Sequence, residues 1–162
     1  FADSLERALE LLGPDVHYLQ DSGVVVGGMH LWGSPWQPEF HSWAFNLPRG
    51  ERLRAVWSRI PSNTDVLITH GPPYGFGDRV PRGRVGCREL LVARSRVRPA
   101  LHLFGHIHED GGVFEDAFGL LANVTTVEGT RGPTVLDVTP GERGSLRVDF
   151  DAPDQNGVAL SR

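Results

Sequence analysis

Cysteine, methionine and long apolar runs are almost absent from this sequence of 162 residues. The single cysteine, Cys87, cannot form an internal disulfide, which fits a reducing compartment and predicts a cytoplasmic protein. No apolar stretch approaches the roughly 20 residues that span a bilayer, and there is no signal-peptide pattern. The net charge of -4 gives no reason to expect nucleic acid or an anionic membrane as a partner.

The chain also lacks a methionine at its start. It begins with Phe1, and its only methionine, Met29, lies inside a strand-like run. A natural open reading frame does not begin this way. We therefore expect a fragment, a processed product or a gene model that is cut at its N-terminus.

The remaining composition is that of a globular protein, with 40% hydrophobic and 22% charged residues. The length suffices for one domain, which we place at residues 1–150, followed by a disordered polar tail over 151–162. The patterns predict helices and strands in alternation, hence an α/β fold. Helices are expected at 4–12, 51–59 and 86–97. Strands are expected within 16–36 and at 65–70, 100–104, 112–115, 118–122, 133–138 and 145–150.

The middle of the chain reads strand, loop, helix, strand. A crossover of this length makes the strands "DVLITH" (65–70) and "ALHLF" (100–104) parallel. Functional residues of parallel sheets gather beyond the carboxyl ends of the strands. His70 ends the first strand, and His106 and His108 follow the second. If the two strands are neighbours, the three histidines converge on one pocket.

A lone histidine at a strand end is usually an ordinary hydrogen-bonded surface residue, but the joint pattern favours metal ligands. His106 and His108 stand two residues apart, so an extended backbone directs both imidazoles to the same side. Gly105 before them allows a tight turn. Glu109 and Asp110 fit equally well as carboxylates that orient a ligand or as a solvated turn.

Several blocks of the sequence together resemble one known family. They are "YLQDS" (18–22), "GSPWQPEFHSWAFNLPRG" (33–50), "THGPPYGFGDRVP" (69–81), "RVGCRELL" (84–91) and "LHLFGHIHEDGGV" (101–113). Within them, "LITHGPP" and "LFGHIHE" look like the C-terminal motifs of the calcineurin-like metallophosphoesterases. The whole set resembles the metallophosphoesterase-domain-containing subgroup most closely and covers most of residues 1–138.

The resemblance implies a four-layer α/β/β/α sandwich that holds two divalent metal ions, Mn, Fe or Zn. It assigns His70 and His106 to one ion and His108 to the other. The implied activity is that of a hydrolase, a metal-dependent phosphoesterase that uses a metal-activated water. The resemblance implies a small phosphorylated substrate such as a nucleotide, in particular a phosphodiester of the cyclic-nucleotide kind. Nothing in the residue spacing separates a phosphodiester from a monoester or a pyrophosphate.

The family's earlier motifs are missing from this chain. Asp15 and His17 spell Asp-x-His, but they directly precede the block at 18–22, which the family places after its third motif. The pair at 77–78 lacks the second aspartate of Gly-Asp-x-x-Asp, and no Gly-Asn-His occurs. The chain therefore corresponds to the C-terminal portion of the family's domain, and no catalytic residue is assigned. Three neutral imidazoles bring no negative charge to two ions, so we predict that these residues alone catalyse poorly.

Other candidate residues carry two interpretations each. The aromatic loop 33–50 could stack a nucleobase or form a hydrophobic cluster that holds the loop down; we favour the cluster, with Trp36 and His41 as the best candidates for substrate contact. Arg79 could bind phosphate, although a solvated loop is slightly favoured. Asn123 resembles the family's asparagine after a late strand and is a candidate to orient a ligand. His102 alternates with apolar residues and is interpreted as structural.

Two other classes of function remain as alternatives. One is a non-catalytic nucleotide-binding or interaction module that keeps the fold with an incomplete metal site. The intact "GHIH" argues against it for a longer parent protein, since a degenerate site is free to lose either histidine. The other is a structural zinc site, which is weak because such sites are usually cysteine-rich.

Overall fold

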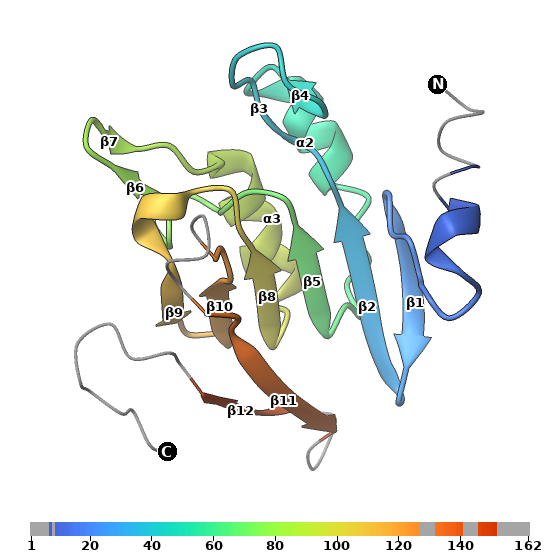
Figure 1. Cartoon of the computed structure of the whole chain (residues 1–162). Coiled ribbons are helices and arrows are strands. Elements are labelled where there is room, and N and C mark those ends of the chain that lie inside the picture. Colours follow the sequence, from blue (N-terminus) through green and yellow to red (C-terminus); the bar gives the residue numbers. More distant parts are fainter. Residues whose placement is uncertain (1–6, 8, 127–131, 141–145, 152–162) are drawn as a thin grey trace.

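The computed structural model describes residue 7 and residues 9–126, 132–140 and 146–151. Its centre is a six-stranded sheet in the order β1-β2-β5-β8-β10-β9 (Figure 1). The strands are β1 (Ser22–Val26), β2 (Met29–Ser34), β5 (Val66–Thr69), β8 (Leu101–Phe104), β10 (Leu120–Asn123) and β9 (Gly112–Glu115). Neighbours among β2, β5, β8 and β10 run parallel, and β1 and β9 pair antiparallel at the edges. The predicted α/β class is confirmed, including the parallel pairing of β5 with β8.

Two helices, α2 (Glu51–Trp57) and α3 (Arg88–Val97), pack against each other and bury one face of the sheet. In Figure 1, α3 lies behind β5 and β8. The buried residues of this core come from both helices, from the segments next to them and from β5: Leu53, Trp57, Ile60, Leu67, Cys87, Leu90, Ala93 and Val97. Burial of these apolar side chains is the main stabilising term for the fold.

Both helices are shorter than predicted, for identifiable reasons. The first ends at Trp57, where the Arg96 guanidinium donates hydrogen bonds to the carbonyls of Trp57 and Ile60. The second begins at Arg88 because Cys87 is its N-cap, and the thiol accepts a hydrogen bond from the Leu90 amide. Gly86 cannot carry a side chain, since a Cβ there would lie 2.6 Å from the Pro73 carbonyl oxygen.

Three small sheets and a short 3-10 helix complete the described structure. Each small sheet pairs two strands: β3 (Gln37–Pro38) with β4 (Asn46–Leu47), β6 (Arg79–Val80) with β7 (Gly83–Arg84), and β11 (Val135–Pro140) with β12 (Leu146–Asp151). The 3-10 helix η1 is His108–Asp110. None of the helices in the described ranges has the length and apolarity to cross a membrane.

Some expectations fall beyond these residues. The predicted helix at 4–12 is described only at its end, where 9–12 are helical. Of the predicted tail at 151–162, only Asp151 is described, as the end of β12, and 152–162 lie outside the described residues. The single domain over 1–150 and the four-layer arrangement stay predictions.

A buried ion pair connects α3 to the turn between β9 and β10. Arg94 is 0% exposed, and its guanidinium contacts the carboxylate of Asp116. The same guanidinium donates to the Gly119 carbonyl at 3.4 Å. The second carboxylate oxygen of Asp116 accepts from the amides of Phe118 and Gly119. The pair therefore fixes the helix against the edge of the sheet.

Cys87 is expected to react slowly with thiol reagents in the native chain. Burial is the main cause that raises the pKa of its thiol to about 11, despite hydrogen bonds from the Leu90 amide and the Trp57 indole. At pH 8 the thiol is therefore almost wholly protonated, and the thiolate is the reactive form. Labelling with a disulfide reagent at pH 8 should be at least about 100-fold slower natively than in urea. Equal rates would contradict the buried position of Cys87.

Candidate metal centre

His70 and His106 meet at the carboxyl ends of β5 and β8. The register pairs Ile68 with Leu103, so the two strands end side by side. The Gly105 amide donates to the His70 carbonyl at 3.0 Å, which holds the two strand ends together. His70 Nε2 lies 3.1 Å from His106 Nδ1, and the ring centroids are 4.6 Å apart. The two imidazoles are therefore in contact as expected, but His106 and His108, and not His70, line the pocket described below.

The backbone at His106 is a tight turn, so the predicted extended geometry of His106 and His108 is wrong. His106 has a φ of 70°, and the Ile107 amide donates to the Gly105 carbonyl at 2.9 Å across it. This is a three-residue γ-turn with positive φ, a strained form that costs on the order of 1–3 kcal/mol in a residue with a side chain. His108 then opens η1. We call residues 105–110 the histidine turn.

Both facing imidazoles are neutral near pH 7. Burial lowers the pKa of His70. Burial also lowers the pKa of His106; the neighbouring His70 and His108 act in the same direction because charging His106 beside them is unfavourable, and Glu109 opposes them. A neutral imidazole is the form that binds a metal ion. Without an ion, one ring must donate its N–H to the other across the 3.1 Å gap.

The segment behind His70 is held by a buried histidine. The Thr69 hydroxyl donates to the Gly71 carbonyl at 2.8 Å and lies 2.9 Å from His102 Nε2. Since the hydroxyl proton is used, the His102 N–H is the donor to Thr69. Burial, reinforced by the charge of Arg94, holds the pKa of His102 well below its ordinary value, so the ring stays neutral. The structural interpretation of His102 is confirmed.

The histidine pair fits two ligands of one ion. Two nitrogens 3.1 Å apart can both lie about 2.0–2.1 Å from a zinc-type ion. No group of three or more histidine, cysteine, aspartate or glutamate side chains in the described part of the chain is placed to hold a metal. His108 and Glu109 are exposed, and the Asp110 carboxylate accepts from the Arg79 amide at 2.8 Å. The described chain thus offers two convergent ligands, and ligation by His108 stays a prediction.

A pocket of about 570 Å³ opens beside the histidine turn. Its polar edge includes His106, His108 and Glu109 of that turn, and Glu39, Arg49 and Arg82 from other segments add charged groups. Its apolar walls come from the aromatic loop, the core and the segment before α3: Trp36, Phe40, Trp43, Trp57, Val80, Pro81, Val85 and Leu90. An apolar pocket with a few polar groups at one edge is the usual form of a small-molecule site.

The aromatic loop forms part of an open wall more than a buried cluster. Phe40 is 43% exposed and Trp43 59% exposed. Their rings stand edge-on to His106, at centroid distances of 5.4 and 6.0 Å. Apolarity alone could not distinguish the two arrangements in the sequence, because both use the same residues. Phe40 and Trp43 also pack on each other, with ring centroids 5.1 Å apart, so the loop has features of both interpretations and substrate stacking stays a prediction.

The other predicted substrate residues divide into two groups. Trp36 lines the pocket, and its indole N–H donates to Asp21 at 2.8 Å. His41 is exposed and packs on Phe40, with ring centroids 4.3 Å apart, and it does not line the pocket. Arg79 is exposed and also lies off the pocket lining. Sequence reasoning missed Arg49, which lines the pocket and donates to the carbonyls of Val85 and Gly86.

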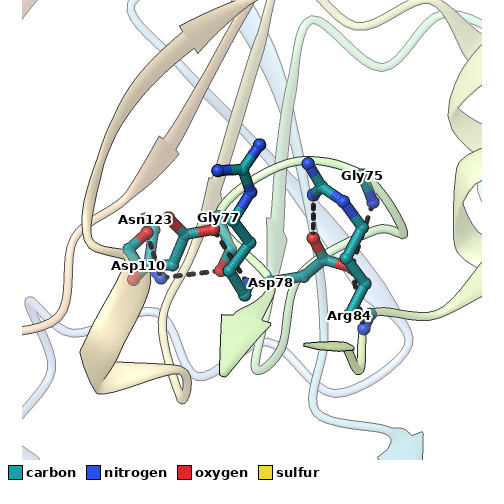
Figure 2. Close-up of polar contacts among 8 residues, drawn as sticks. Gly75, Gly77, Asp78, Arg84, Asp110 and Asn123 are labelled. Atoms are coloured by element: carbon teal, nitrogen blue, oxygen red, sulfur yellow. Dashed lines mark hydrogen bonds and ion pairs between the residues drawn. The ribbon is translucent and has the colours of Figure 1, made fainter. Parts of the chain in front are cut away.

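Asn123 is fully buried at the end of β10, 0% exposed. Its amide nitrogen donates to the Asp110 carbonyl (Figure 2) and to the Ile107 carbonyl, so it contacts the histidine turn through the backbone. Asp78, which the sequence pattern excludes as a metal ligand, is also fully buried. Its carboxylate accepts hydrogen bonds from the Arg84 guanidinium and from the amides of Gly75 and Gly86.

Comparison with known proteins gives matches over much of the chain. Metallophosphoesterase domain-containing protein 1 of Homo sapiens is 52% identical over 135 residues, covering 79% of this chain and 41% of that protein. The Mus musculus protein of that name matches equally. A UPF0046 protein of Caenorhabditis elegans is 47% identical over 108 residues, covering 65% of this chain and 27% of that protein. The chain spans less than half the length of these curated relatives.

No protein-family model matches the chain. A solved crystal structure aligns with a TM-score of 0.55 at 17% sequence identity, covering 90% of this chain and 59% of that one. At that identity the likeness concerns the fold alone. It agrees with the mixed sheet and helices described above.

Proposed function

This chain belongs, over the residues that match, with the metallophosphoesterase domain-containing proteins, and from that premise we propose that it supplies part of the site of a metal-dependent phosphoesterase. The single observation that carries the proposal is the facing pair of His70 and His106, of which His106 lines the pocket. The ends of the neighbouring strands β5 and β8 bring two neutral imidazoles within 3.1 Å, with a strained backbone at one of them. Strain of this kind concentrates at functional sites.

In this proposal His70 and His106 hold one divalent ion, and His108 contributes to a second. Imidazole ligands suit Mn, Fe or Zn. Such ions supply a water of lowered pKa and positive charge for the phosphoryl oxygens. The chain's own contribution is to present unprotonated ring nitrogens, which the lowered pKa values of His70 and His106 provide at neutral pH. In the four-layer sandwich that the resemblance implies, the family's earlier motifs would supply the further ligands.

The substrate proposed for this site is a small phosphodiester with a planar organic group, such as a cyclic nucleotide. The exposed rings of Phe40 and Trp43 flank the histidine turn, where they can stack or pack edge-on against a base. Arg82 lines the same pocket and brings a guanidinium, which binds phosphate oxygens well. The phosphoryl group would then lie at the polar edge of the pocket and the organic group along its aromatic wall.

Hydrolysis of an activated aryl phosphodiester by this chain tests the proposal. We expect turnover that requires Mn²⁺, Fe²⁺ or Zn²⁺ and that is lost in His106→Ala. The rate should lie far below the 1–1000 s⁻¹ common among enzymes, since imidazoles alone carry no charge to bridge two ions. His30→Ala is the matched control, because His30 pairs with Asp65 and lies off the pocket lining. Hydrolysis no faster than with the free ion, or unchanged in His106→Ala, would refute the proposal.

A further inference from the structure

We propose that Asn123, which the resemblance makes a candidate to orient a ligand, is a positioning residue that joins the histidine turn to a neighbouring loop that also lines the pocket. That loop, residues 75–87, is called the pocket loop, since Val80, Pro81 and Val85 line the pocket from it. The inference rests on the proposed function for the meaning of the histidine turn. Asn123 itself lines no part of the pocket.

The hydrogen bonds of the Asn123 amide reach both segments at once. Its Nδ2 donates to the Gly77 carbonyl at 3.0 Å and to the Asp110 carbonyl at 3.2 Å (Figure 2). It also donates to the Ile107 carbonyl at 2.8 Å. Two protons serve three acceptors, so at least one proton is shared. Its Oδ1 accepts from the Thr125 amide at 3.2 Å. One buried side chain therefore bonds the pocket loop once and the histidine turn twice.

The hydrogen bonds from Asn123 to the histidine turn lie next to His106 and constrain its backbone. Ile107 is the next residue, and its amide closes the γ-turn by donating to the Gly105 carbonyl. Asn123 holds the carbonyl of that same residue, so both sides of Ile107 are fixed. The Asp110 carbonyl lies at the end of η1, beyond His108. The segment that carries both histidines is thus held from inside the fold at two points.

On the other side, the pocket loop is tied to the same amide through Gly77. A Cβ at Gly77 would lie 2.9 Å from the Asn123 Cβ, so only glycine permits this approach at its φ of 58°. A second connection runs from the Arg79 amide to the Asp110 carboxylate. Within the loop, the buried Asp78 carboxylate holds the amides of Gly75 and Gly86 and the Arg84 guanidinium (Figure 2).

These contacts predict that Asn123 sets the geometry of the histidines without touching an ion or a ligand. Replacing a residue that orients the metal ligands without itself binding the ion typically lowers metal affinity by about 10–100-fold. A residue that only fills the core would change the stability of the whole fold and leave metal affinity and the local turn as they were. The two roles therefore give different results in one pair of variants.

The experiment compares Asn123→Leu with Leu121→Ala in the full 162-residue chain. Leu121 is equally buried, in the same strand, and bonds neither segment through its side chain. The first readout is Zn²⁺ affinity by competition with a chelator. The second needs no metal: the hydrogen-exchange rate of the Ile107 amide, relative to amides of β5. If Asn123→Leu does not fold, Asn123→Ser, which keeps one donor, replaces it.

We expect Asn123→Leu to weaken Zn²⁺ binding by about 10–100-fold and to speed exchange of the Ile107 amide selectively. Leu121→Ala should lower stability, with Zn²⁺ affinity within about threefold of the parent chain. Selective exchange at Ile107 without Zn²⁺ binding in any chain would support the positioning role while refuting the proposed function. Equal effects of the two substitutions on the Ile107 exchange rate, or unchanged exchange in the Asn123 variant, would overturn the inference.

Discussion

Replacing Asp116 by alanine is expected to remove about 3–5 kcal/mol from the free energy of unfolding, the largest stability loss of any single change considered. Asp116 is the carboxylate that faces the fully buried guanidinium of Arg94. Its removal leaves a positive charge in the core with only the Gly119 carbonyl as a remaining acceptor among the described contacts. Burial already lowers the pKa of Arg94, and the hydrogen bond and charge of Asp116 oppose that lowering.

Urea unfolding followed by circular dichroism measures this loss. For a chain of this length the midpoint of thermal unfolding should fall by roughly 6–20 °C. The exposed pair of Glu51 and Arg54 is the matched control, since Glu51→Ala removes a surface ion pair worth about 0.5 kcal/mol or less. The double change Arg94→Met with Asp116→Ala should lose less than Asp116→Ala alone, because it removes the uncompensated charge. A loss below about 1 kcal/mol for Asp116→Ala would show that water reaches the guanidinium.

Substitution of His106 by alanine is expected to weaken binding of Zn²⁺ or Mn²⁺ by more than about 100-fold. Replacing a residue that only orients a metal ligand already weakens metal binding by about 10–100-fold, and loss of a ligand should cost more. His106 is the ring that faces His70 and also borders the pocket. Isothermal titration with the parent chain and the variant measures the ratio. His30→Ala serves as a control, because His30 is paired with Asp65, away from the histidine turn. An affinity within threefold of the parent chain would remove His106 from the metal centre.

The positive φ of His106 separates its ligand role from its effect on stability. Alanine retains the strain of a side chain at a φ of 70°, whereas glycine adopts that conformation freely. His106→Gly and His106→Ala should therefore lose metal equally. The glycine variant should be the more stable of the two, by on the order of 1 kcal/mol. Greater stability of the alanine variant would contradict the γ-turn.

The parallel strands and the meeting of His70 with His106 could be predicted, because both follow from local patterns. Apolar runs of strand length, a helix-length crossover and a histidine at each strand end determine which edge of the sheet holds the residues. The spacing of His106 and His108 was misleading. Gly105 indicated where the chain turns, but the positive φ lies at His106, and η1 begins two residues later.

The buried polar contacts of Arg94 and Asn123 could not be predicted from the sequence, for a different reason. Arg94 lies among the exposed arginines of α3 in a sequence that gives no sign of its burial, since its partner Asp116 is 22 residues away. Asn123 was singled out by resemblance, yet its three acceptors come from backbone carbonyls, which every residue carries. Tertiary contacts of this kind leave no periodic pattern. The pocket likewise depends on how the aromatic loop folds back toward the histidine turn.

The central claim is that His70 and His106 of this chain hold one metal ion between them. The most direct test is ¹⁵N NMR of the histidine side chains during a titration with Zn²⁺. The account predicts that the resonances of His70 Nε2 and His106 Nδ1 shift together to the positions of metal-bound nitrogen and saturate at the same ratio of ion to protein. Saturable binding that shifts other histidines and leaves these two unchanged would contradict it, as would the absence of any shift.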